Sequence, residues 1–266
     1  MSSGRKMPGL DRFLDYRVSK LIALYQENRR ADLLPIDLAE IARYAGVHSI
    51  DEQEMIPEAV LQVRTDGFRI VLQNNFLDQP GRKTRQRFSL AHELGHILFF
   101  DADRLPPKPL KDAPTGDHLE VACHQAASLL LLPSNLLKTQ ISQFADFPRL
   151  EHLVQLAIRF DVSVEVLLRR LNQMGYFNDP QRTVALVRGP DERIEYAICP
   201  DWLLSGGLIS KPERGRPFAD WFSPEGSGQI RLKSGIDSFG HKRTLSARRL
   251  KIGASSSTYE IEFIET

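Results

Sequence analysis

The stretch that decides the fold is "FSLAHELGHILFF", residues 88–100, in which two histidines stand four positions apart and a glutamate follows the first. Apolar residues surround these polar ones, a pattern that predicts a largely buried helix. On one face of such a helix, the Cβ atoms of His92 and His96 are about 5–6 Å apart, so both side chains can bind one metal ion. The stretch therefore predicts either a zinc-dependent hydrolase site or a buried helix that has these letters by chance.

Glu93 has the position of a general base in such a site. Its side chain is rotated by about 100° from that of His92 around the helix axis, so it lies beside the metal instead of on it. Zinc lowers the pKa of water towards about 7, and a carboxylate within hydrogen-bond reach then takes the proton. Two buried histidines also need polar partners, which one metal ion supplies. A glycine inside a helix, such as Gly95, is less favourable than alanine by about 1 kcal/mol of helix stability. Its presence therefore indicates that another backbone or a substrate approaches closely at this position.

The third ligand must come from another part of the chain. In the arrangement HExxHxxGxxH a glycine turn returns a third histidine to the metal, but Phe99 and Ala102 hold those positions here. A second helix is expected over residues 118–132, with Glu120 and His124 on one face. Glu120 is the expected ligand and His124 the alternative. The group that does not bind the metal is expected to orient a ligand or to contact the substrate.

The composition excludes several classes of partner and of fold. The chain of 266 residues has 35 Lys and Arg against 34 Asp and Glu, so no overall charge attracts nucleic acid or anionic membrane. The start of the chain lacks an apolar signal core, and the longest aliphatic run, residues 129–132, is too short to span a bilayer. We expect a cytoplasmic protein without a membrane partner. Cys123 and Cys199 are the two cysteines, and both are expected to be ordinary buried thiols.

The segments on either side of the central helix carry their own signals. Helical periodicity over residues 11–46 predicts two helices, the second ended by Gly46. The run "AVLQVRTDGFRIVLQNN", residues 59–75, predicts a β-hairpin around Asp66 and Gly67. Residues 81–87, "GRKTRQR", are expected to form a basic loop.

In the second half of the chain, the sequence pattern changes from helical to strand-like at about residue 178. Residues 134–175 are expected to be helical. After residue 178 the chain is strand-like, in the runs "RTVALVR", "RIEYAIC", "GQIRLK" and "TYEIEFIE", with segments rich in glycine and proline between them. A domain boundary is therefore expected near Phe177.

Two stretches together resemble the ImmA/IrrE family of metallopeptidases. They are "RFSLAHELGHILFF" and, after a loop, "EVACHQAASLLLLP"; the family has an HExxH helix and then a helix of the form ExxANxFAxxLLMP. The resemblance spans about residues 20 to 175 and implies that Glu120 is the third ligand. Two departures are Cys123-His124 in place of Ala-Asn and Ala126 in place of Phe.

The resemblance also implies a fold and a function. The expected fold class is α+β: a zincin-like metallopeptidase domain over 1–135, a helix-turn-helix-like segment over 136–177, and a C-terminal α+β domain over 178–266, similar to a GAF-like sensor. The expected activity is that of an endopeptidase that holds Zn²⁺, or another divalent ion such as Mn²⁺. The implied protein substrate is a helix-turn-helix repressor, whose cleavage releases a stress-response or mobile-element regulon.

The competing interpretation is a transcription regulator without proteolytic activity, with a structural or sensory zinc and with DNA bound through residues 150–175. Glu165, Arg169, Arg170 and Asn172 would then face the DNA. Apolar residues occupy most of this second helix, which favours a packing role, and a basic cluster at residues 241–251 is expected to be solvated.

A third interpretation is a binding module whose zinc is only structural. Glu93 argues against both alternatives to the peptidase, because a structural site needs no base beside its metal.

Overall fold

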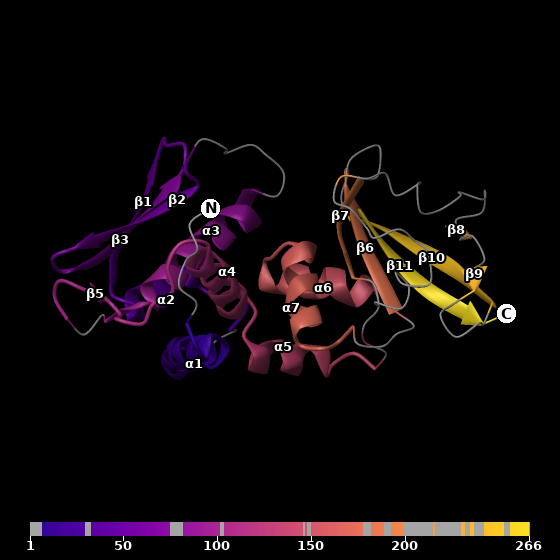
Figure 1. Ribbon diagram of the computed structural model, residues 1–266, viewed down its shortest axis with the longest axis horizontal. Helices are drawn as coiled ribbons and strands as arrows, with labels where there is room; N and C mark the ends of the chain where they lie inside the picture. The colour runs from indigo at the N-terminus through magenta and orange to yellow at the C-terminus, as the bar shows by residue number, and fades with distance from the viewer. Residues whose placement is uncertain are drawn as a thin grey trace. The chain divides into compact units, whose positions relative to one another are not determined.

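The fold is mixed α+β, as the computed structural model shows (Figure 1). It describes residues 7–29, 33–74, 82–101, 104–145, 147, 150–177, 182–188, 193–198, 215, 230–231, 235–236, 242–252 and 256–265. The chain divides into two compact units, Met1–Gln143 with Ala157–Ser163, and Phe144–Leu156 with Val164–Thr266. Within the described ranges, no helix combines the length and the apolar character that a membrane crossing requires.

Two helices begin the first unit, as the periodicity predicts. Helix α1 (Leu10–Asn28) buries one face, formed by Leu14, Val18, Leu21, Ile22 and Tyr25. Helix α2 (Leu38–Tyr44) begins after Asp37, whose carboxylate accepts hydrogen bonds from the backbone N–H groups of Ala39 and Glu40 at 3.1 Å. This is the usual way to satisfy the first N–H groups of a helix. Gly46 follows α2 in the left-handed conformation, with φ +83°.

A three-stranded sheet comes next, and it contains the predicted hairpin. Its strands are β1 (Val47–Gln53), β2 (Ala59–Arg64) and β3 (Gly67–Gln73), in the order β1-β3-β2. Strands β2 and β3 are antiparallel, whereas β1 and β3 are parallel. Gly67 is required at the turn, because its φ is +148° and an added Cβ would lie 2.7 Å from the carbonyl oxygen of Gly46.

Strand β2 is an edge strand, and one side of its backbone is not used by β3. The N–H of Gln73 donates to the carbonyl of Glu58 at 2.9 Å, so residue 58 is in a hydrogen-bonded pair with β3. Because hydrogen-bonded and non-hydrogen-bonded positions alternate in an antiparallel pair, the backbone groups of Ala59, Leu61 and Val63 face the free edge.

The central helix α3 (Arg82–Ile97) lies against β2 and β3 and packs on α4 (Asp117–Leu131). The expectation that residues 81–87 form a loop is wrong, since α3 already begins at Arg82. The two arginines that the structure describes there have partners across the fold: Arg85 pairs with Glu58, and Arg87 pairs with Asp161. Helix α4 ends at Leu131, just before Pro133, as expected.

Arg87 connects three segments of the first unit. Its guanidinium donates to the backbone carbonyls of Ile36 at 3.0 Å and Asp161 at 3.1 Å, and it lies 3.4 Å from the Asp161 carboxylate. Asp161 has a left-handed backbone, with φ +52°, at the end of α6 (Leu150–Phe160). Burial lowers the pKa of Arg87 from its usual value, and the nearby carboxylates partly oppose this. Lys83 also reaches Asp161, at 3.0 Å, but its side chain is 81% exposed.

We expect Arg87→Met to destabilise the protein by about 1–3 kcal/mol, because two carbonyls and a carboxylate lose a half-buried donor. Lys83→Met removes an exposed ion pair to the same carboxylate and should have a smaller effect. Urea denaturation of the two variants measures the difference. Equal losses would show that the contacts of Arg87 do not carry this connection.

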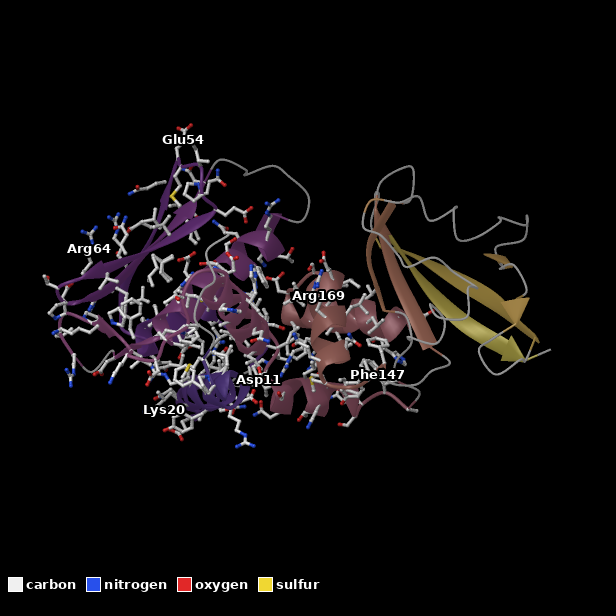
Figure 2. The ribbon with its side chains drawn as sticks, in the orientation of Figure 1. Asp11, Lys20, Glu54, Arg64, Phe147 and Arg169 are labelled. Atoms are coloured by element: carbon white, nitrogen blue, oxygen red, sulfur yellow. The ribbon has the colours of Figure 1, made fainter. Side chains whose placement is uncertain are left out.

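Helix α7 (Val164–Gln173) uses much of its surface for packing. Val164, Leu167, Leu168 and Leu171 are buried, and so is Arg170, which is 7% exposed. Of the residues considered for DNA contact, Arg169 is exposed on this helix but pairs with Glu165 at 2.8 Å (Figure 2). The helix ends as expected before Gly175, which has φ +81°. These features favour the packing interpretation of the segment.

The strands that follow α7 form one antiparallel sheet, orange to yellow in Figure 1. They are β6 (Arg182–Arg188), β7 (Arg193–Ile198), β8 (Ile230–Arg231), β9 (Gly235–Ile236), β10 (Lys242–Ile252) and β11 (Ser256–Glu265). The order is β7-β6-β11-β10-β8, and β9 also pairs with β10. The predicted strands are therefore present, whereas Cys199 lies outside the described residues. In the register of β10 and β11, Arg243 is opposite Glu265 and Arg248 is opposite Glu260.

Candidate metal centre

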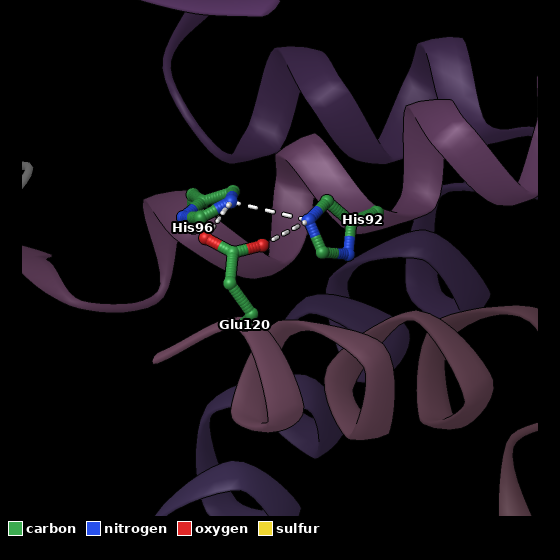
Figure 3. A group of neighbouring side chains, drawn as sticks. All are labelled: His92, His96 and Glu120. Carbon is green, nitrogen blue, oxygen red and sulfur yellow. Dashed lines mark hydrogen bonds and ion pairs between the residues drawn. The ribbon is translucent and has the colours of Figure 1, made fainter. Parts of the chain in front are cut away.

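Three side chains from two helices meet at one point. Atom Nε2 of His92 lies 3.2 Å from Nε2 of His96 and 3.2 Å from Oε2 of Glu120. The other oxygen of Glu120, Oε1, lies 3.8 Å from His96 Nε2. Figure 3 shows the two imidazoles of α3 above the carboxylate that α4 carries. In the described part of the chain, this group has the composition and spacing of a metal site.

The donor set fits a small divalent cation. Two atoms bound to one zinc ion at 2.0–2.1 Å in tetrahedral geometry lie roughly 3.3 Å apart. The separations between the three donors are close to this value, and all of the ligand atoms lie within 4.8 Å of one another. Two imidazoles with one carboxylate are also a donor set typical of catalytic zinc.

The protonation of the histidines suits metal binding. Burial, followed by the charges of His96 and His124, lowers the pKa of His92 to about 4. Burial also lowers the pKa of His96. Both rings are therefore neutral near pH 7 and have a lone pair available for a cation. Their contacts with Glu120 are then not ion pairs between opposite charges.

Glu93 lies on the same helix as the two histidines and is not one of the three donors. It is only 8% exposed, and burial raises the pKa of its carboxyl to about 7. The backbone N–H of Leu61 hydrogen-bonds to this carboxylate and partly opposes the shift. The backbone of Leu61 faces the free edge of β2. The side chain of Glu93 therefore reaches from the HExxH helix to that edge. Sequence reasoning missed this contact because a backbone N–H leaves no trace in the residue type.

Gly95 allows the two helices to approach closely, as its position in α3 predicts. A Cβ added at residue 95 would lie 2.9 Å from the carbonyl oxygen of Cys123 and 3.1 Å from the Cβ of Ala126. Both neighbours belong to α4, and the first is a backbone atom that cannot rotate away. The small residue therefore sets the distance between the helix with the two histidines and the helix with Glu120.

We expect Gly95→Ala to lower both stability and metal affinity, although alanine favours a helix by about 1 kcal/mol. The added methyl group overpacks the contact, which typically costs about 1–3 kcal/mol, and displaces α4 together with Glu120. Adding Ala126→Gly should restore only part of the loss, because the Cys123 carbonyl remains in the way. Urea denaturation and zinc titration test both effects. A more stable variant with unchanged zinc affinity would contradict the role of Gly95.

His124, the alternative ligand, lies beside the three donors. Its ring centroid is 4.7 Å from that of His92, and the ring stacks on Phe88 at 5.6 Å. Phe88, early in α3, stacks on His124, late in α4, whereas His96, late in α3, contacts Glu120, early in α4. The two helices therefore run in opposite directions. Sequence reasoning did not single out Phe88, although it precedes His92 by one turn on the same face.

The other polar residues near the motif lie outside the cluster. Asp101 pairs with Arg104 at 2.9 Å, and His118 is exposed on α4. Cys123 is fully buried, and burial raises the pKa of its thiol, so it is the buried thiol that the sequence suggested.

Comparisons with known proteins agree with this architecture. Residues 67–172 match the family model described as the IrrE N-terminal-like domain. The chain is similar to the radiation response metalloprotease IrrE of Deinococcus radiodurans, with 35% identity over 102 residues, 36% of this chain and 30% of that protein. The protein of the same name from Deinococcus deserti is 38% identical over 94 residues, 34% of this chain and 32% of that protein. The matches thus span about a third of the length of these relatives.

The matched segment is therefore similar to a metallopeptidase domain. The family model covers residues 67–172, which is less than half of this chain.

Proposed function

We propose that this chain is a zinc-dependent endopeptidase, in which His92, His96 and Glu120 hold the metal and Glu93 is the general base. The main support is the convergence of three donor atoms within 4.8 Å of one another, beside a buried carboxylate that is not one of them. A purely structural metal site does not need this fourth group.

Each residue then has a defined task. A bound zinc ion would supply Lewis acidity, which polarises a peptide carbonyl and lowers the pKa of water. Glu93 takes a proton from water at its carboxylate, and its burial favours a basicity suited to neutral pH. The hydrogen bond from Leu61 N–H keeps this carboxylate at the edge of β2.

The substrate is proposed to be an extended polypeptide. The outward backbone groups of Ala59 and Val63, with the carbonyl of Leu61, can pair with a peptide strand, which adds to the sheet in the manner of β-augmentation. Such a strand would pass beside Glu93, because Leu61 and Glu93 are in contact. The edge therefore supports a protein substrate over a small molecule.

The protein cut is proposed to be a helix-turn-helix repressor, whose loss releases a stress-response or mobile-element regulon. This rests on the family and on relatives that carry the name radiation response metalloprotease. A cytoplasmic location follows from such a substrate. The C-terminal sheet is proposed to belong to a GAF-like sensor module, with the limits 1–135, 136–177 and 178–266 for the three parts.

The test is to incubate the purified chain and a helix-turn-helix repressor encoded beside its gene with zinc or manganese, and to identify fragments by mass spectrometry. We expect metal-dependent cleavage at a defined bond. Intact repressor under all conditions, together with normal binding of the chain to promoter DNA, would support the regulator instead. The burial of Arg170 and the pairing of Arg169 with Glu165 argue against that alternative.

A further inference from the structure

The buried Nδ1 atom of His92 has no hydrogen-bond partner among the residues that the structure describes. The other nitrogen of this ring, Nε2, faces His96 and Glu120. Figure 3 shows the two nitrogens on different edges of the ring, with Nδ1 away from the carboxylate. When Nε2 binds a metal ion, the neutral ring carries its proton on Nδ1. A buried N–H donor then needs an acceptor.

His124 is in a position to supply that acceptor. It stands one turn after Glu120 on α4, and its ring centroid is 4.7 Å from that of His92, with a tilt of 54° between the planes. The side chain is exposed, so its ring can rotate without disturbing the core. Stacking on Phe88, at 5.6 Å and 23°, keeps the ring beside His92.

We propose that His124 is a positioning residue: one of its ring nitrogens accepts the Nδ1–H of His92 and fixes the orientation of this ligand when the metal is bound. The inference rests on the proposed function. Helix α4 then contributes two groups from successive turns. Glu120 binds the metal, and His124 accepts the hydrogen bond from the metal ligand His92. Partners of this kind orient most metal-binding histidines, and their loss typically weakens metal binding by about 10–100-fold.

Two substitutions separate hydrogen bonding from packing at this position. His124→Phe keeps a ring that can stack on Phe88 but removes the acceptor. His124→Asn removes the ring but offers an amide oxygen as acceptor. Gln125→Met is the matched control, because Gln125 Oε1 is another buried acceptor without a hydrogen bond in the described structure.

Zinc affinity is measured by competition with a chromogenic chelator. We expect a fall of about 10–100-fold for His124→Phe and a change of only a few-fold for His124→Asn and Gln125→Met. The second measurement is NMR of zinc-loaded protein with ¹⁵N-labelled histidine. The Nδ1–H of His92 should exchange slowly with water in the wild type and in His124→Asn, and rapidly in His124→Phe. Thermal melting of the metal-free proteins checks that all variants fold.

Several results would overturn the inference. Unchanged zinc affinity and slow exchange in His124→Phe would exclude His124 as the acceptor, and a loss seen only in Gln125→Met would assign the role to Gln125. Loss of zinc in both His124 variants, with an altered spectrum of the cobalt-substituted protein, would make His124 a ligand. If the wild type binds no zinc, the proposed function fails together with the inference; if it binds zinc but cuts no repressor, the inference is still tested by these measurements.

Discussion

Replacing Glu93 by glutamine should lower peptide cleavage by about 100-fold or more while zinc binding is retained. Glutamine has nearly the shape of glutamate and can still accept the hydrogen bond from Leu61 N–H, but it cannot take a proton. The three proposed metal donors are unchanged by the substitution. The measurement is the initial rate of fragment formation from the repressor, with zinc content determined on the same samples.

Glu54→Gln is a suitable control, because Glu54 is an exposed glutamate between β1 and β2 and its replacement removes the same charge (Figure 2). It should cut at the wild-type rate. Equal cleavage by the wild type and Glu93→Gln would rule out Glu93 as the base. A regulator with a structural zinc predicts a different outcome, in which Glu93→Gln controls its promoter normally and the wild type leaves every candidate repressor intact.

Glu120→Ala and His92→Ala should each lose stoichiometric zinc, because two protein donors are too few to retain the ion. Zinc should then no longer raise the melting temperature of these variants. In the wild type, free zinc at 100 times the dissociation constant should stabilise the folded state by about 2.7 kcal/mol. Elemental analysis after dialysis and thermal melting with added zinc check the two expectations. His118→Ala on the same helix should behave as the wild type, since His118 lies outside the donor group.

Full zinc content in Glu120→Ala would instead move the third ligand to another residue, with His124 as the first candidate. The outcome for Glu120 is informative because its side chain is 55% exposed, so its truncation leaves the core of α4 intact.

The parts of the fold that depend on local pattern could be predicted from the sequence. Both early helices, the hairpin at Asp66-Gly67 and the strand runs after residue 178 are confirmed. So is the close approach of another backbone to Gly95. In each case the signal lies in neighbouring residues: a period of 3.6 or 2, a turn dipeptide, or a glycine where a helix does not favour one.

The features that depend on distant partners could not be predicted. The run at 81–87 resembles a solvated loop because of its charges, yet it forms the first turns of α3. Arg85 pairs with Glu58 and Arg87 with Asp161, residues that are 27 and 74 positions away. The same applies to Leu61, whose contact with Glu93 depends on which side of β2 each backbone group faces.

The domain boundary near Phe177 rests on a change from helical to strand-like sequence, and it stays a prediction.

The unequal exposure of the three donors has a kinetic consequence. His92 and His96 share one helix, and their side chains are 15% and 20% exposed, whereas the Glu120 side chain on α4 is 55% exposed. The two imidazoles would therefore be held in place before a cation arrives, and Glu120 would be the last donor to complete the coordination and the first to leave. A chelator in solution would compete first with Glu120, without any opening of the core.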